Sequence, residues 1–136
     1  MNDLQQTLSI IKPDAVERNL SEKIKTIFLK NNLIISNSKK LHISKEEAAD
    51  FYKVHQAKPF YDQLCSYLSS GPIEVLILEG KDAVKKNRDL MGATDPKNAK
   101  DGTIRKLYGL SIDKNSVHGS DSLENAKEEI SFFFNN

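Results

Sequence analysis

The 136-residue chain is predicted to fold as an α+β sandwich, in which helices cover an antiparallel β-sheet. Two observations lead to this prediction. Short β-prone apolar runs alternate with segments whose apolar residues recur at helical spacing. No internal repeat, low-complexity tract or long linker separates these segments. The length suits one domain, residues 1–136, with a single core.

The first elements follow from local signals. Leu8–Ile11 is a short apolar run, and Pro13 after it cannot continue the pairing, so a strand is expected to end there. Ser21 is expected to cap a helix that ends at Asn31-Asn32. The next segment, Leu33–Leu41, has the composition of a strand.

The middle of the chain carries clearer signals. Ser44 and Glu47 have the spacing of a capping box, in which each side chain satisfies an unpaired backbone N–H at the start of a helix. Phe60–Leu68 predicts another helix. Ile73–Leu78 is the most apolar run in the chain, which predicts a central strand buried on both faces.

The last elements complete the fold. Lys81–Leu90 predicts a helix that Gly92 ends, and residues 93–116 are expected to be irregular. Asp121 and Glu124 resemble a second capping box, which would begin a C-terminal helix. The predicted elements follow the order strand, helix, strand, helices, strand and helix, with a possible last strand at the sheet edge. This order suits a ferredoxin-like sandwich.

Composition limits the classes of function. The 20 basic and 19 acidic residues give a formal net charge of +1, which argues against a dedicated binder of nucleic acid or anionic membranes. No window is apolar and long enough for a transmembrane span, and the first residues do not read as a signal peptide. The lone Cys65 suits a reducing compartment, so a cytoplasmic location is expected.

The segment from Asn115 to Ser122, NSVHGSDS, is the most informative part of the chain. It is expected to hold His118 in a glycine- and serine-rich turn before a helix, where hydroxyls and backbone N–H groups favour an anion. Three interpretations of His118 remain open from this context alone: a surface histidine without a role, a metal ligand, and a nucleophile that accepts a phosphoryl group. No Cys or second His lies at ligand spacing, which weakens the metal interpretation.

A phosphate-binding loop is missing from the sequence. Neither GxxxxGK[ST] nor GxGxxG occurs, and the signature set of protein kinases is also absent. A phosphate site would therefore need scattered cations to converge in space, and the candidates are Lys12, Arg88 and Arg105.

The chain resembles nucleoside diphosphate kinases from about Thr7 to Phe133. The NxxHGSDS block around His118 matches the active-site signature of that family. Supporting blocks follow in the family's order: Ile11-Lys12-Pro13-Asp14, Lys58-Pro59-Phe60, Ser70-Gly71-Pro72, Gly92-Ala93-Thr94-Asp95-Pro96 and Gly102-Thr103-Ile104-Arg105.

The resemblance implies an enzyme that moves the γ-phosphate of a nucleoside triphosphate, usually ATP, to a nucleoside diphosphate by a ping-pong mechanism. The phosphoryl group would reside on Nδ1 of His118, with Glu129 hydrogen-bonded to the imidazole site and Ser120 beside the phosphohistidine. By the same resemblance, Mg²⁺ would be held by the nucleotide phosphates rather than by a protein cage.

The resemblance also implies the nucleotide site. Phe60 matches the residue that stacks on the base, a contact that tolerates every base. The positions that match the phosphate- and ribose-holding residues of the family are Lys12, Tyr52, Arg88, Thr94, Arg105 and Asn115.

Some positions depart from the family pattern. Lys106-Leu107 stands where many members have a small residue and an aspartate, directly after Arg105, and Asp101 replaces a frequent proline. Self-association is expected, as a hexamer before a tetramer. Two alternatives remain: a phosphohistidine carrier or regulatory protein without efficient nucleotide turnover, and a ferredoxin-like nucleic-acid binder, which the near-neutral charge disfavours.

Overall fold

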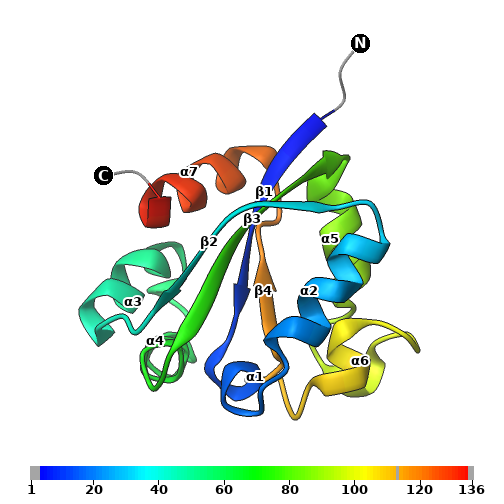
Figure 1. The fold of residues 1–136 in the computed structure, drawn as a ribbon. Helices are drawn as coiled ribbons and strands as arrows, with labels where there is room; N and C mark the ends of the chain where they lie inside the picture. The colour runs from blue at the N-terminus through cyan, green and yellow to red at the C-terminus, as the bar shows by residue number, and fades with distance from the viewer. Residues whose placement is uncertain (1–3, 113, 135–136) are drawn as a thin grey trace.

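The computed structural model describes residues 4–112 and 114–134. In this part of the chain, an antiparallel sheet has the strand order β2-β3-β1-β4. The strands are β1 (Leu4–Ile11), β2 (Ile34–Leu41), β3 (Ile73–Lys81) and β4 (Val117–Gly119). Figure 1 shows helices on both sides of this sheet, so the predicted α+β sandwich of ferredoxin-like order is confirmed.

The helices divide between the two faces of the sheet. They are α1 (Pro13–Glu17), α2 (Ser21–Lys30), α3 (Lys45–Phe51), α4 (Tyr61–Leu68), α5 (Ala83–Met91), α6 (Ile104–Tyr108) and α7 (Leu123–Phe134), with short 3-10 turns at Lys53–His55 and Pro96–Asn98. In Figure 1, α2, α5 and α6 lie on one side, and α3, α4 and α7 lie on the other.

Strand β3 explains why the core has two halves. Successive side chains of a strand point to opposite faces. Ile73 and Val75 pack in one buried cluster with residues of α3, α4 and α7, whereas Leu76 and Leu78 pack in the other with residues of α2 and α5. Since both faces of β3 are covered, the run is apolar except for Glu74, which is buried and pairs with Lys25 of α2, and the predicted central strand is confirmed.

Several predicted boundaries are right in kind but displaced. Strand β1 begins at Leu4, before the apolar run that signalled it. The capping box is confirmed: the Ser44 hydroxyl accepts from the Glu47 N–H, and the Glu47 carboxylate accepts from the Ser44 N–H. Lys81 ends β3 instead of beginning a helix, because it pairs with Leu4 of β1. Helix α5 then starts after Asp82, whose positive φ of 50° turns the chain.

Two predicted helix caps are wrong. Ser21 is the first residue of α2, not its cap, because the turn after α1 holds Leu20 in the helical region as the N-cap. At the start of α7, Ser122 replaces Asp121 as the capping side chain, since its hydroxyl accepts the Asn125 N–H at 3.0 Å. The Asp121 carboxylate instead accepts a hydrogen bond from the Asn125 side chain.

The segment expected to be irregular contains helix α6. Thr103 caps it through a hydrogen bond from the Lys106 N–H, and Asp95 caps the preceding 3-10 turn through the Lys97 N–H. Both caps are local signals of the kind that predicted α3. Helix α6 is only five residues long, so it shows too little periodicity to be recognised from its apolar residues.

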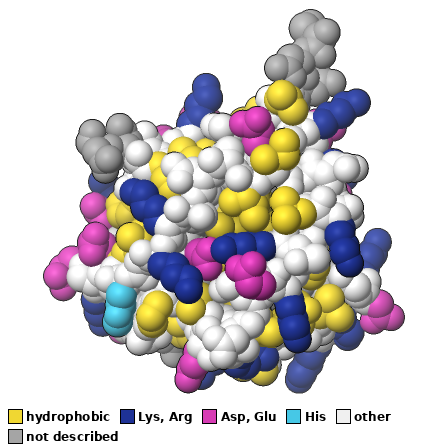
Figure 2. Space-filling model, in the orientation of Figure 1, with side chains coloured by type: hydrophobic (Ala, Val, Ile, Leu, Met, Phe, Trp, Pro, Cys, Tyr) yellow, Lys and Arg dark blue, Asp and Glu magenta, His cyan; other side chains and the backbone are white. Residues whose placement is uncertain are grey.

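The surface carries both signs of charge. Figure 2 shows basic and acidic side chains interspersed over one face, with apolar side chains between them. None of the helices in residues 4–112 and 114–134 has the length and apolarity needed to cross a bilayer.

Candidate active site

One pocket of about 990 Å³ brings together predicted site residues that are far apart in the sequence. Those in its wall are Lys12, Tyr52, Phe60, Arg88, Thr94, Arg105, Asn115, His118 and Glu129. Ser120, the remaining predicted site residue, is buried behind the wall. The cations whose convergence the sequence could not establish therefore do share one cavity.

His118 lies in the middle of β4 rather than in the predicted turn, opposite Ile10 of β1. The alternation of side chains along a strand explains its direction. Val117 is buried in the core cluster on the α5 side, and a Cβ on Gly119 would lie only 2.3 Å from the side-chain nitrogen of Asn87 in α5. His118 faces the other way, into the pocket.

Glu129 fixes the imidazole of His118. Helix α7 runs back along β1, which brings the Glu129 carboxylate to 3.0 Å from Nε2 of His118. The same oxygen, Oε1, accepts a hydrogen bond of 2.7 Å from the Ser120 hydroxyl. Ser120 is fully buried and also exchanges hydrogen bonds with Leu8 of β1. Ser120 thus holds the carboxylate, and the carboxylate holds the ring.

Aromatic rings confine His118 on its other sides. The Phe51 ring lies edge-on at a centroid distance of 5.3 Å, and the Tyr52 ring at 6.4 Å. Burial raises the pKa of the Tyr52 hydroxyl, so this side chain stays protonated and neutral beside the histidine. Phe51 and Phe132 both line the pocket and pack against each other. The ring of His118 therefore has little freedom to turn.

Hydrogen bonds to protein acceptors hold two cations of the pocket, Lys12 and Arg105, in place. The Lys12 ammonium donates to the Asn115 side-chain oxygen at 3.0 Å, and the Asn115 amide donates to the Thr94 carbonyl. The Arg105 guanidinium donates to the carbonyls of Gly92 and Val117. Burial, and next the neighbouring Arg88, lower the pKa of Arg105 to about 10, so it remains charged at neutral pH. An anion in this pocket would offset the cost of burying these charges.

The outer part of the pocket is apolar and open. The Phe60 side chain is 43% exposed and lies at the start of α4, with the Lys58 ammonium 5.6 Å from its ring centroid. Ile112, 56% exposed, also lines the pocket. Phe60 is thus no core residue, although aromatic residues at helical spacing usually are. Tyr52, by contrast, is buried.

Sequence reasoning missed some residues of this wall. Phe51 directly precedes Tyr52 at the end of α3, but adjacent residues of a helix point in different directions, so Tyr52 did not indicate it. His55 lies in no motif that the sequence offered, but it lines the pocket beside Tyr52. Its pKa is lowered by burial and then by the charge of Lys58. Ile112 lies in a segment without periodicity, so no pattern pointed to it.

The Lys106-Leu107 departure leaves Arg105 in place. Both side chains lie on the exposed side of α6, whereas Ile104 and Arg105 are buried. The Thr103 cap that starts α6 sets this orientation, and the two carbonyl contacts of Arg105 are made by residues outside the helix.

Comparisons with known proteins identify the family of the chain. Residues 5–136 match the family model described as nucleoside diphosphate kinase. The chain belongs to the nucleoside diphosphate kinase family. It is 57% identical, over 131 residues, to the nucleoside diphosphate kinase of Nitratiruptor sp., with 96% of each chain covered.

Solved structures of the nucleoside diphosphate kinase family share the fold. The enzyme of Aquifex aeolicus superposes with a TM-score of 0.96 at 38% identity, covering 98% of this chain and 96% of that one. The enzyme of Halobacterium salinarum, solved in complex with CDP, gives a TM-score of 0.92 at 39% identity, with 97% and 88% covered. These likenesses extend over nearly the whole chain.

Proposed function

We propose that this nucleoside diphosphate kinase transfers phosphate by a ping-pong reaction through His118. The observation that carries the proposal is the contact between Nε2 of His118 and Oε1 of Glu129 inside a pocket lined by cations. A carboxylate acceptor at Nε2 favours the tautomer with its proton on that nitrogen. The lone pair of Nδ1 is then available for attack.

In the first half-reaction, Nδ1 attacks the γ-phosphorus of a nucleoside triphosphate. A P–N bond forms, the bond to the β,γ-bridging oxygen breaks, and the nucleoside diphosphate leaves with that oxygen. A second nucleoside diphosphate then attacks the phosphohistidine through a β-phosphate oxygen, which reverses these steps and regenerates His118. As the P–N bond forms, the imidazole gains positive charge, which the Glu129 carboxylate would stabilise.

The other pocket residues are assigned as substrate contacts. Lys12 and Arg105 would meet the γ-phosphate, where charge must be held in the transition state. Arg88 and Thr94 would meet the β-phosphate, and Asn115 would meet a sugar hydroxyl. Tyr52 would support the phosphates and ribose from the pocket floor.

The apolar outer part of the pocket suits the nucleobase. Phe60 would stack on the base, and its exposed position at the rim supports this role. Stacking reads the π-face that all bases share, so we expect nucleotides with different bases to be accepted. The Halobacterium salinarum relative was solved with CDP, which supports a nucleoside diphosphate in the same pocket here.

Magnesium is proposed to enter with the nucleotide. In the described residues, no group of three or more His, Cys, Asp or Glu side chains is placed to hold a metal ion. The donor set nevertheless fits Mg²⁺, because exposed Asp121 and Glu128 in the pocket wall could accept hydrogen bonds from metal-bound waters. Bound to the phosphates, the ion would neutralise part of their charge.

We also propose that residues 1–136 form one nucleoside diphosphate kinase domain, that it works in the cytoplasm and that it self-associates, as a hexamer before a tetramer. Strand β2 is at the edge of the sheet with Ile34 exposed, and Leu107 and Leu110 are exposed in and just after α6. Such apolar side chains suit contacts between copies of the chain. Light scattering after size exclusion measures the assembly, and a monomer would contradict the proposal.

The test is a two-step labelling experiment. The protein is incubated with γ-labelled ATP, separated from nucleotide, and then chased with GDP. The expected result is an acid-labile label that moves to GDP, and His118→Ala should take up none. His42→Ala is the matched control, because His42 is exposed, lies outside the residues that line the pocket, and has its ring nitrogen at the Ser69 carbonyl. A label that forms but never transfers would instead support the carrier alternative.

A further inference from the structure

A strained turn precedes the catalytic strand. Ser116 is fully buried and has φ of +77°, a region that residues other than glycine rarely adopt. The Val117 N–H donates to the Asn115 carbonyl at 2.9 Å, so the chain reverses over three residues as in a γ-turn with positive φ, which is rare and strained. Asn115 and His118, on either side of this turn, both line the nucleotide pocket.

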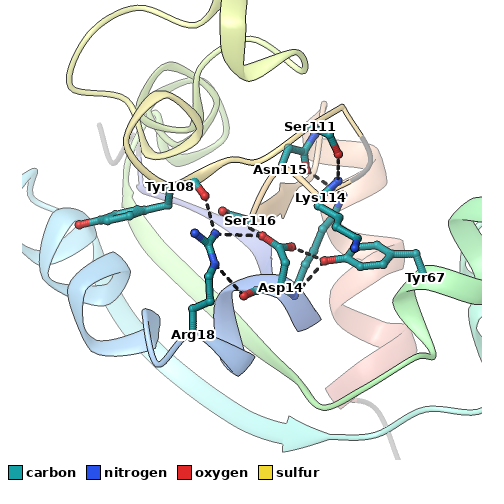
Figure 3. Close-up of polar contacts among 9 residues, drawn as sticks. Asp14, Arg18, Tyr67, Tyr108, Ser111, Lys114, Asn115 and Ser116 are labelled. Atoms are coloured by element: carbon teal, nitrogen blue, oxygen red, sulfur yellow. Dashed lines mark hydrogen bonds and ion pairs between the residues drawn. The ribbon is translucent and has the colours of Figure 1, made fainter.

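The side chain of Ser116 is tied to the buried carboxylate of Asp14. The Ser116 hydroxyl donates to Oδ2 of Asp14 at 3.3 Å, and the Ser116 carbonyl accepts the Lys12 N–H at 2.8 Å. Asp14 is at the start of α1, so these two contacts fasten both the side chain and the backbone of the turn to the segment that carries Lys12. Figure 3 shows Asp14 between Ser116 and the side chains of Arg18 and Tyr67.

The Asp14 carboxylate is itself fixed from two other sides. The Tyr67 hydroxyl, from α4, donates to Oδ1 and accepts the Asp14 N–H at 2.8 Å. Arg18 donates to Oδ2 at 3.4 Å and also to the carbonyl of Tyr108, at the end of the helix that carries Arg105. Burial, and then the hydrogen bond to Asp14, raise the pKa of Tyr67, which keeps its hydroxyl protonated as a donor.

This arrangement has a functional consequence. A non-glycine residue at positive φ persists only where its surroundings hold it. If the turn relaxed, the backbone from Asn115 to His118 would shift, and reacting groups are sensitive to misplacement of about 1 Å. Stability of the fold alone gives no reason to keep strain at this place, two residues before the proposed nucleophile.

We propose that Asp14 is a positioning residue for phosphoryl transfer. Its carboxylate, held by Tyr67 and Arg18, keeps the Ser116 turn in the strained conformation that sets His118 and Asn115 against Lys12. The inference rests on the proposed function, because it concerns the geometry of the same site.

The test compares two replacements of one side chain. Ser116→Ala removes the hydroxyl and leaves a residue that is strained at φ of +77°. Ser116→Gly removes the same hydroxyl, but glycine adopts this φ without strain and needs no anchor. At saturating ATP and a temperature where circular dichroism shows all variants folded, Ser116→Ala should slow His118 phosphorylation about 10- to 100-fold. The phosphorylation rate of Ser116→Gly should stay within about threefold of the wild-type rate.

A double-mutant cycle separates positioning from general support of the fold. Asp14→Asn should slow phosphorylation in the wild-type background and have a clearly smaller effect in the S116G background, where the turn no longer depends on the carboxylate. In each variant, the maximal rate of phosphorylation should change more than the ATP concentration that gives half of that rate. If Asp14→Asn does not fold, the comparison of the alanine and glycine variants decides alone.

The outcomes are distinguishable. Equal phosphorylation rates for wild type and Ser116→Ala would overturn this inference and leave the proposed function intact. Equal slowing by Asp14→Asn in both backgrounds would also overturn it, since a merely structural carboxylate gives that result. A wild-type protein that takes up no phosphate would overturn both the proposed function and this inference.

Discussion

The Glu129 carboxylate offers the sharpest test of how His118 is activated. Its Oε1 accepts from Nε2 of His118 at 3.0 Å and from the Ser120 hydroxyl at 2.7 Å. Glu129→Gln keeps the length of the side chain and one possible acceptor but removes the charge. The substitution therefore changes the electrostatics of the contact much more than its packing.

The size of the effect follows from the change of charge during the reaction. Neutral His118 becomes cationic as phosphorus bonds to Nδ1, so the bond to Glu129 is stronger in the transition state than before it. A hydrogen bond to a charged group contributes about 1.5–3 kcal/mol, against about 0.5–1.5 kcal/mol for a neutral one. Loss of most of a charged bond in the transition state would slow phosphorylation by about 10- to 150-fold.

Rapid-quench measurement of the acid-labile label at saturating ATP gives the first-order rate of this step. Glu124→Gln is the matched control, because it removes the same charge from an exposed position of the same helix that lies outside the residues lining the pocket. The dependence on ATP concentration should be similar in both variants. Equal slowing of the two variants would show that any lost negative charge on α7 slows the reaction, whatever its contact with His118. A Glu129→Gln rate within twofold of the wild-type rate would refute the reasoning.

Two further predictions concern stability. Ser122→Ala should lower the free energy of unfolding by about 1 kcal/mol, because it removes the hydroxyl that accepts the Asn125 N–H at the start of α7; an equal loss in Asp121→Ala, measured by chemical denaturation, would contradict this cap. The pKa of His55 is lowered from 6.5, by burial first and then by Lys58, so its contribution to stability is present above pH 6.5 and lost as the pH falls. His55→Gln should therefore flatten the decline of Tm between about pH 7 and 5, and an unchanged profile would contradict the assignment.

Local signals in the sequence predicted much of the fold correctly. The mostly apolar run Ile73–Leu78 predicted the central strand because a strand covered on both faces has few places for polar side chains. The spacing of Ser44 and Glu47 identified the start of α3 because a capping box is complete within four residues. The same kind of signal misled at Asp121, since Ser122 beside it offers a competing acceptor.

Other features are decided by contacts between distant segments. Strand β4 has only three residues and exists because β1 supplies its partners, so its own sequence reads as a turn. The strained backbone at Ser116 likewise depends on Asp14, 102 residues earlier in the chain. No local pattern could have indicated either.

The sequence by itself determined that His118 lies in a glycine- and serine-rich segment, and its blocks pointed to the family. The tertiary structure decided what surrounds that histidine. Lys12, Arg88 and Arg105 share one pocket because β1, α5 and α6 are brought together by the sheet and its core. Charges repel one another and give no drive to converge, so only the packing of apolar residues elsewhere in the chain could assemble them.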